Sequence, residues 1–239
     1  MLSLEKQNQW REQYRRTRPD WQPATELFAE LVREHLRADA VLLDIGCGRG
    51  GLVEQLQHPV AQMMGVDPDW QSLMEHRLNI PRAAGLSDAL PFAAECVDVV
   101  FAGWVLEHLE RPLLTFQSIY RVLKPGGVFV FITPNARHPL SLFNSILGRM
   151  GQMQSWLVNR LYGRSQADTF PTYYRVNQIK TLRRIGSECG LRLKTIHAVP
   201  DPSYLAFTPA LFRLISRIEE NLPEQRKLHL VGVFQREAR

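Results

Sequence analysis

Short apolar runs alternate with amphipathic stretches over most of the chain. The apolar runs are bounded by glycine, proline or aspartate and predict strands at residues 41–45, 61–66, 83–85, 96–103, 128–133, 191–199 and 228–234. Apolar residues at helical spacing predict helices at 23–37, 52–57, 111–123, 176–189 and 211–218. This alternation indicates an α/β fold, in which helices cover the faces of a sheet.

Residues 136–175 depart from this alternation. They contain a broad apolar stripe at helical spacing, which is interrupted by Gly148 and Gly151. We expect a helical cap that is inserted after the fifth strand and packs as a lid over the adjoining site. Such a stripe could instead lie on a membrane surface through residues 139–164, or pair with another subunit. The pattern leaves these alternatives and the oligomeric state open.

The composition is that of one ordinary α/β domain, 1–239, with 45% apolar residues. The three cysteines are widely spaced and form no C-x-x-C pair, so we expect neither a disulfide framework nor a zinc site. The first ten residues lack the apolar core of a signal peptide, and no uncharged apolar run approaches the roughly 20 residues that span a bilayer. We therefore expect a cytoplasmic protein that is at most peripheral to a membrane.

The net charge of +5 is unevenly distributed along the chain. Residues 41–135 carry six basic and ten acidic side chains, whereas residues 136–196 carry ten basic and two acidic ones. The basic segment is either a solvated face or a region that attracts an anionic ligand or a membrane surface. Because its basic residues are not interleaved with a recognisable RNA-binding module, we expect no nucleic-acid partner.

The stretch Val41 to Gly50 indicates a buried strand that ends in a glycine turn and leads directly into a helix. Glycines let a backbone approach a ligand closely, and unpaired N–H groups at the helix start make the turn polar. Gly46, Gly48 and Gly51 satisfy G-x-G-x-x-G, which is typical of dinucleotide sites. Asp44, however, would repel a pyrophosphate. It suits a ligand with ammonium and sulfonium charges, such as S-adenosylmethionine.

A second acid, Asp67, follows the second predicted strand, 21 residues after Gly46. This distance is close to one helix plus one strand, so Asp67 should lie at the carboxyl end of the neighbouring strand. A carboxylate there can accept hydrogen bonds from both hydroxyls of a ribose. The alternative is that Asp67 only caps a helix beginning near Asp69.

Four segments, in the expected order, resemble class I S-adenosylmethionine-dependent methyltransferases, and in particular their type 11, ubiquinone-pathway-like group. Residues 41–50 resemble motif I, a hydrophobic strand followed by D-x-G-x-G-x-G, and 85–92 resemble G-D-A-E-x-L-P-F. Residues 96–109 are similar to the F-D-V-V and V-L-E-H-L segments, and 121–135 to the R-V-L-K-P-G-G turn with its strand. Together the matches extend over residues 41–135.

The resemblance implies a Rossmann-like sheet of seven mostly parallel strands flanked by helices, with the last strand antiparallel. It implies S-adenosyl-L-methionine as the cofactor and S-adenosyl-L-homocysteine as the product. The parts would be an N-terminal arm and helix (1–40), the cofactor-binding core (41–135), the helical acceptor cap (136–175), and the C-terminal helices with strands six and seven (176–239). The cofactor-binding positions that it implies are Asp44, Gly46, Cys47, Gly48, Asp67, Pro68, Leu86, Ser87, Asp88 and Trp104.

One of these positions departs from the family pattern. The family usually has an acid or amide at the position of Leu86, where it meets the adenine amino group. Because Leu86 is apolar, the adenine is held either by backbone groups of Leu86 and Ser87 or by Asp88 after a shift of the loop.

The segment from Trp104 to His108 should lie where the methyl group points, because open α/β sheets bind ligands outside the carboxyl ends of their strands. Some relatives read E-x-x-E-H here and hold a divalent ion. In this chain Trp104 replaces the first acid, and the remaining Glu107 and His108 are a poor cage for Mg²⁺, so we expect no metal. His108 is either a general base for an acceptor hydroxyl or a structural histidine bonded to its own helix.

We expect in-line methyl transfer to the hydroxyl of a small-molecule, lipid or glycan acceptor, although O-, N- and C-methylation are not distinguished by these motifs. The candidate acceptor contacts are His138, Tyr173, Tyr174 and Arg175. The two tyrosines lie at a loop-to-helix junction that should face the site, but core packing would equally explain them. Residues 1–20 are either a flexible basic arm or a segment that folds over the occupied cofactor site.

Two other functions compete with this interpretation. A nicotinamide-dependent oxidoreductase would use the literal G-x-G-x-x-G, but Asp44 and the L-P-F and K-P-G-G segments argue against it. A binding module that holds S-adenosylmethionine without chemistry is the other alternative. A thermal-shift comparison of NAD with S-adenosylhomocysteine separates the first of these from a methyltransferase.

Overall fold

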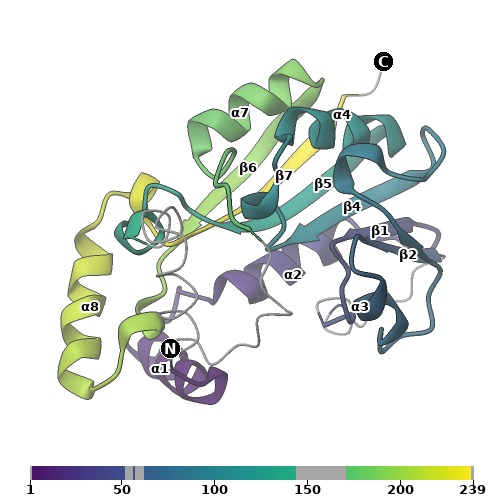
Figure 1. Cartoon of the computed structure of the whole chain (residues 1–239). Coiled ribbons are helices and arrows are strands. Elements are labelled where there is room, and N and C mark those ends of the chain that lie inside the picture. Colours follow the sequence, from purple (N-terminus) through teal and green to yellow (C-terminus); the bar gives the residue numbers. More distant parts are fainter. Residues whose placement is uncertain (1, 52–55, 57–61, 144–170, 238–239) are drawn as a thin grey trace.

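The computed structural model describes residues 2–51, 56, 62–143 and 171–237. Seven strands form one sheet in the order β3-β2-β1-β4-β5-β7-β6 (Figure 1). They are β1 (Val41–Ile45), β2 (Gln62–Asp67), β3 (Arg82–Ala84), β4 (Val97–Gly103), β5 (Leu123–Pro134), β6 (Leu191–Val199) and β7 (His229–Arg236). Strands β1 to β5 pair in parallel, whereas β7 is antiparallel to both β5 and β6. The predicted mostly parallel sheet with an antiparallel last strand is confirmed.

Helices cover both faces of this sheet, with α4 and α7 on one face and α2 on the other (Figure 1). The α-helices are α1 (Leu4–Thr17), α2 (Ala24–Glu34), α3 (Trp70–Met74), α4 (Pro112–Val122), α7 (Ile179–Glu188) and α8 (Pro209–Asn221). The 3₁₀ turns are η2 (Ser87–Ala89), η3 (Leu106–His108), η5 (Pro202–Leu205) and η6 (Glu224–Arg226).

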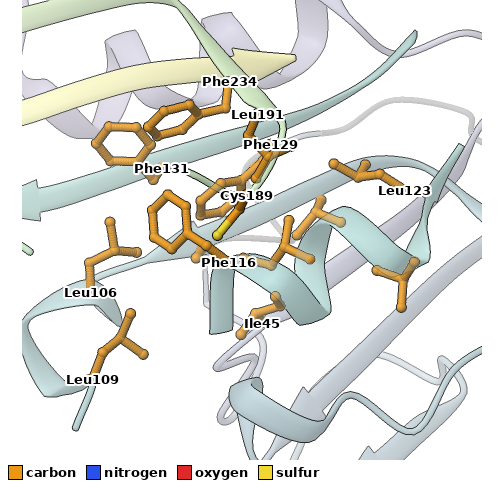
Figure 2. Packing of buried hydrophobic residues seen from close by; sticks show 14 of the residues in the cluster. Ile45, Leu106, Leu109, Phe116, Leu123, Phe129, Phe131, Cys189, Leu191 and Phe234 are labelled. Carbon is orange, nitrogen blue, oxygen red and sulfur yellow. The ribbon is translucent and has the colours of Figure 1, made fainter. Parts of the chain in front are cut away.

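The face beneath α4 and α7 is packed by aromatic rings. The ring of Phe116 on α4 meets Phe129 and Phe234 edge-on, with centroids 5.8 and 5.4 Å away. Leu106 and Leu109 lie at one end of this group (Figure 2). Full burial of such side chains contributes about 1.5–3 kcal/mol each. Because Leu106 and Leu109 are part of this cluster, their burial fixes the position of the chain that follows β4.

The opposite face is packed by α2, which follows Pro23 directly. Its apolar residues recur at helical spacing, so Phe28, Leu31 and Val32 point together into the sheet. The Phe28 ring lies 6.0 Å from that of Phe101 on β4. The helix predicted at 23–37 is therefore present, although it ends at Glu34.

The N-terminal segment is a helix, and the expectation of a flexible basic arm was wrong. Helix α1 packs against η5 and α8 beyond the carboxyl end of β6 (Figure 1). Trp10 stacks on Phe212 with ring centroids 4.6 Å apart, and Tyr14 is buried beside them. Arg11 donates to the buried carboxylate of Asp201 at 2.7 and 2.9 Å. These contacts order the arm, because apolar burial offsets the entropy of fixing its backbone.

Some predictions lie outside the described residues. These are the helix at 52–57, apart from residue 56, and the central part of the acceptor cap, residues 144–170. The division of the chain into core, cap and C-terminal part stays a prediction.

Candidate functional site

The glycine turn lies between the carboxyl ends of β1 and β2. Gly46 has a φ of +74°, which a residue with a side chain rarely adopts. A Cβ at Gly46 would also overlap the Cγ2 methyl of Val105. The N–H of Gly46 donates to Val66 on β2 at 2.8 Å. The need for glycine at this position therefore comes from the fold itself, in addition to any approach of a ligand.

Gly48 lies in the same turn and is half-buried. It has a φ of +46°, and the nearest atom to a Cβ placed there would be the Oδ2 of Asp67, 4.0 Å away. Its N–H donates to that same Oδ2 at 2.9 Å. The backbone around Gly48 thus leaves room for a ligand next to a carboxylate.

Asp67 ends β2 and accepts a second hydrogen bond, from the N–H of Asp69 to its Oδ1 at 2.8 Å. The alternative that Asp67 caps a helix is wrong, because Asp69 is the N-cap of α3 and accepts from Gln71. Each carboxylate oxygen keeps further acceptor capacity, which a pair of vicinal hydroxyls can use.

Asp44 is buried on β1, and its strand pairs directly with β2, which ends in Asp67. Burial raises the pKa of the Asp44 carboxyl well above its usual range, and the neighbouring charge of Asp67 raises it further. No ion pair joins Asp44 to any other residue within the described ranges. A buried carboxyl without a cation is costly to ionise, so this position favours a positively charged ligand.

Two further predicted cofactor positions differ in exposure. Pro68 is exposed immediately after Asp67. The side chain of Cys47 is buried, and its sulfur would lie 2.7 Å from a Cβ placed on Gly65 of β2. Burial, followed by the charges of Asp44 and Asp67, raises the pKa of this thiol to about 12. Cys47 therefore contributes packing beneath the turn rather than a reactive thiolate.

The loop after β3 contains the predicted adenine contacts. The Leu86 side chain is 54% exposed, and the Ser87 hydroxyl lies 3.1 Å from that of Thr115. The carboxylate of Asp88 pairs with Arg111 at 2.6 Å. The Asp88 alternative thus requires this ion pair to open, whereas Leu86 already presents an apolar surface beside the carboxyl end of β3.

Trp104 follows β4 with a φ of +61°, which is unusual for a residue with a bulky side chain. Its N–H donates to Ile132 at 3.0 Å, and its ring meets that of the buried His229 edge-on at 5.0 Å. Burial lowers the pKa of His229 to about 4, so its imidazole is neutral near pH 7. These contacts at the carboxyl edge of the sheet stabilise the strained backbone conformation of Trp104.

His108 ends η3, and its Nδ1 donates to the carbonyl of Pro171 at 2.8 Å. The interpretation of His108 as a histidine bonded to its own helix was therefore wrong. Burial lowers its pKa, and the bond to Pro171 opposes this in part. A neutral imidazole that donates through Nδ1 has a basic Nε2, as a general base requires.

The segment that contains Tyr173, Tyr174 and Arg175 lies directly against η3. The N–H groups of Tyr173 and Tyr174 both donate to the carbonyl of Glu107, at 2.7 and 3.1 Å. Arg175 donates to the carbonyl of Glu110 at 2.6 Å, and its guanidinium lies 5.2 Å from the centre of the Tyr173 ring. The Tyr173 side chain is 40% exposed, so it is not a core residue.

His138 is the predicted acceptor contact that the structure keeps away from solvent. Its Nδ1 accepts from the N–H of Leu140 at 3.1 Å, and its Nε2 donates to Glu219 of α8 at 2.7 Å. Both ring nitrogens are thus used in joining the end of β5 to α8.

Sequence reasoning missed a role for Glu107, whose side chain is buried in a polar network. Its Oε2 accepts from the hydroxyl of Thr133 at 3.0 Å, and the amide of Asn177 donates to the same hydroxyl at 2.5 Å. Burial raises the pKa of Glu107 to about 7. The available signal was an acid inside the otherwise apolar stretch V-L-E-H-L directly after a strand.

In the described part of the chain, no three His, Cys, Asp or Glu side chains converge as a metal site. The expected lack of a metal stays a prediction. None of the helices in the described ranges has the length and apolarity needed to cross a bilayer.

These features define a class of protein. The sheet reverses its direction of growth between β1 and β4, and the glycine turn and both acids lie at the carboxyl ends of β1 and β2. This is the arrangement of an open, Rossmann-like α/β sheet, a class of fold that binds ligands outside the carboxyl ends of its strands at such a reversal.

The family follows from sequence. Residues 43–131 match the family model described as "Methyltransferase domain". The chain is 35% identical over 144 residues to a protein named ubiquinone biosynthesis O-methyltransferase of Ruegeria pomeroyi, covering 57% of each chain. It is 33% identical over 106 residues to the mitochondrial ubiquinone biosynthesis O-methyltransferase of Mus musculus, covering 39% of this chain and 28% of the relative. The chain thus spans about half or less of these relatives.

Solved structures show the same fold. An S-adenosylmethionine-dependent methyltransferase from Mesorhizobium loti superposes with a TM-score of 0.61 at 18% identity, covering 87% of this chain and 96% of that one. A geranyl diphosphate C-methyltransferase from Streptomyces coelicolor, in complex with S-adenosyl-L-homocysteine, has a TM-score of 0.59 at 16% identity, covering 88% and 77%. Residues 43–131 therefore match a methyltransferase domain by sequence, and the solved structures show that the chain has the same fold as such proteins. The predicted family, and with it the cofactor of the family, are confirmed.

Proposed function

We propose that this protein transfers the methyl group of S-adenosylmethionine to a hydroxyl of a small, lipid-like acceptor. The observation that carries the proposal is the pair of buried acids, Asp44 and Asp67, beside the turn of Gly46 and Gly48. Asp67 would accept the ribose hydroxyls, and Asp44 would face the positive charges of the cofactor. Hydroxyl transfer is supported by the relatives named O-methyltransferases.

The chemistry needs little from the protein beyond alignment and exclusion of water. The sulfonium methyl is attacked in line by the acceptor oxygen, the S–CH₃ bond breaks, and S-adenosylhomocysteine leaves. A base is needed to take the hydroxyl proton, and we assign this role to the neutral His108. Tyr173, Tyr174 and Arg175 would contact the acceptor from the segment against η3. We propose a location in the cytoplasm, with membrane contact limited to the surface.

The same fold does not by itself imply methyl transfer, because one structural neighbour is titled a [4+2]-cyclase (TM-score 0.59, 16% identity). The deciding experiment combines calorimetry and turnover. Calorimetry should show S-adenosylhomocysteine binding and no NAD binding. Labelled S-adenosylmethionine should then transfer its methyl group to members of a panel of phenols, quinols and prenylated alcohols. If S-adenosylhomocysteine binds but no acceptor is methylated, the protein is a binding module without methyltransferase activity. If only NAD binds, the proposal is refuted.

Asp44 provides a sharper control for the cofactor. Asp44→Asn keeps the shape of the side chain but removes its charge, so it should weaken S-adenosylmethionine, which carries the sulfonium, more than S-adenosylhomocysteine, which does not. We expect about a tenfold loss for the first, equal to about 1.4 kcal/mol of electrostatic attraction. Equal losses for both ligands would remove the electrostatic role of Asp44.

A further inference from the structure

Turn η3 lies between the two halves of the proposed site. On one side Val105, which precedes η3, packs against Gly46 of the cofactor turn. Leu106 is buried in the aromatic cluster of the sheet (Figure 2). A displacement of η3 would therefore reach the cofactor turn through Val105.

On its other side η3 holds the segment 171–175. Three backbone groups of that segment bond to it: the N–H groups of Tyr173 and Tyr174 to the carbonyl of Glu107, and the carbonyl of Pro171 to the Nδ1 of His108. This segment contains the proposed acceptor contacts. The same short turn thus contacts both the cofactor turn and the acceptor side.

The side chain of Glu107 fixes η3 to the sheet. It is 5% exposed and accepts from Thr133 at the end of β5, and Thr133 in turn accepts from Asn177, which lies two residues beyond the segment. The N–H of Ala136 donates to the carbonyl of Asn177 at 2.8 Å, which ties the segment to the chain after β5. Glu107, Thr133 and Asn177 form what we call the Glu107 network.

A contribution to folding stability does not explain why polar side chains are buried in the Glu107 network. Burying a carboxyl is costly, and the Oδ1 of Asn177 is also buried without a hydrogen-bond partner among the described residues. Apolar side chains of similar size would pack here at lower cost. A costly buried network is expected where it sets a geometry that function requires.

We propose that Glu107 is a positioning residue which, through Thr133 and Asn177, aligns the acceptor-side segment 171–175 with the cofactor turn. This inference rests on the proposed function, because it gives that segment its role. It assigns Glu107 a place behind the site, with its carboxyl turned into the core towards Thr133.

Hydrogen exchange with and without S-adenosylhomocysteine tests this role. Amides of this segment exchange when it opens locally, and a bound ligand should suppress that opening. In the unaltered protein, saturating S-adenosylhomocysteine should therefore slow exchange of peptides covering 171–177 by about fivefold or more. Glu107→Ala and the isosteric Thr133→Val should bind the ligand within about threefold but lose this protection. Glu107→Gln should restore it, because its amide oxygen accepts from Thr133. Glu110→Gln, an exposed acid in the same stretch, is the matched control and should behave like the unaltered protein.

The outcomes separate this inference from the proposed function. If the unaltered protein does not bind S-adenosylhomocysteine, the proposed function fails and the inference with it. If it binds but residues 171–177 exchange at the same rate with and without ligand, only the inference is overturned. It is also overturned if Thr133→Val folds, binds and keeps full protection. A general loss of structure would raise exchange in β4 and β5 as well, which the same peptide maps reveal.

Discussion

Individual residues at this site are governed by burial. Asp44, Glu107 and His229 are all at most 5% exposed. Burial raises the pKa of the two carboxyls and lowers the pKa of the histidine. The raised pKa of each carboxyl favours its protonated form, and the lowered pKa of His229 leaves its imidazole neutral near pH 7. A cationic cofactor beside Asp44 would favour the ionised form of this buried carboxyl.

Glu107 should make stability depend on pH. Its pKa is about 7 in the folded protein and near 4.5 when unfolded, so the folded state holds a proton that the unfolded state has lost. The free energy of unfolding should fall by about 3 kcal/mol as the pH rises from about 4.5 to 7, and then level off. Urea titrations of Glu107→Gln should lack this fall.

The comparison with Glu107→Gln is necessary because His229 acts in the opposite direction. Its pKa is lowered to about 4, so its contribution to stability is complete above about pH 6.5 and is lost as the pH falls towards 4. Subtracting the two titration series cancels this contribution. A constant difference between pH 5 and 8 would show that Glu107 has an ordinary pKa.

His108 is tested by turnover. If its Nε2 removes the acceptor proton, His108→Ala should lower kcat by about 100-fold or more, and the loss should be smaller for acceptors with more acidic hydroxyls. Binding of S-adenosylhomocysteine should remain. A change within about twofold would mean that His108 only holds Pro171 through their hydrogen bond.

At the scale of elements, the turn after β1 is fitted against the turn after β4. Gly46 combines a φ of +74° with direct packing against Val105. Two separate costs therefore oppose any side chain at this position: the left-handed backbone and the overlap with a methyl group.

Gly46→Ala should lower the free energy of unfolding by about 2–5 kcal/mol, from about 1–2 kcal/mol of backbone strain and about 1–3 kcal/mol of overpacking. Gly126→Ala is the matched control, because Gly126 has a φ of +81° but no atom within 4 Å of a Cβ. In the double variant Gly46→Ala with Val105→Ala, the overlap disappears, so the loss should be smaller than the sum of the single losses. Strict additivity in denaturant titrations would contradict the contact.

Much of the element-scale structure follows from the sequence, because apolar runs and glycine turns are local signals. The strands from β1 to β7 are found within a few residues of the predicted ranges, apart from β5, which begins at Leu123 rather than 128. The position of Asp67 follows from the length of one helix plus one strand. The contacts of η3 could not be predicted, since they join Glu107 to Thr133 and Asn177 from distant parts of the chain.

The helical nature of α1 was also beyond local reasoning. Residues 1–20 are polar enough to indicate a flexible arm. The helix is stabilised by Trp10 and Tyr14, which pack on a segment about 200 residues away. Tertiary contacts of this kind override local propensity.

At the scale of the whole molecule, the N-terminal helix completes the carboxyl edge of the sheet. Arg11 on α1 pairs with Asp201, whose side chain is 3% exposed and which also accepts from Ser203. Helix α1 and the segment that begins at Asp201 therefore lie together at the carboxyl edge of the sheet, whereas the strand β7 ends at the opposite edge (Figure 1).

Arg11→Ala should lower the free energy of unfolding by about 2 kcal/mol or more, because it leaves the Asp201 carboxylate buried without its cation. Arg16→Ala removes a 76% exposed arginine from the same helix, and its 3.6 Å contact with Glu12 should contribute less than about 0.5 kcal/mol. Thermal or urea denaturation distinguishes the two variants. Equal stability of both would show that α1 docks without help from Arg11.

Because α1 packs on residues 201–212, it cannot reach its native position until those residues have been synthesised. Trp10 and Tyr14 leave the ribosome first, yet Phe212, on which they pack, is added almost 200 residues later. At about 5–20 residues per second this interval lasts on the order of ten seconds or more, during which two large aromatic rings have no native partner. The sheet from β1 to β5 can assemble in the meantime. The growing polypeptide thus exposes these two apolar rings until residue 212 has been synthesised.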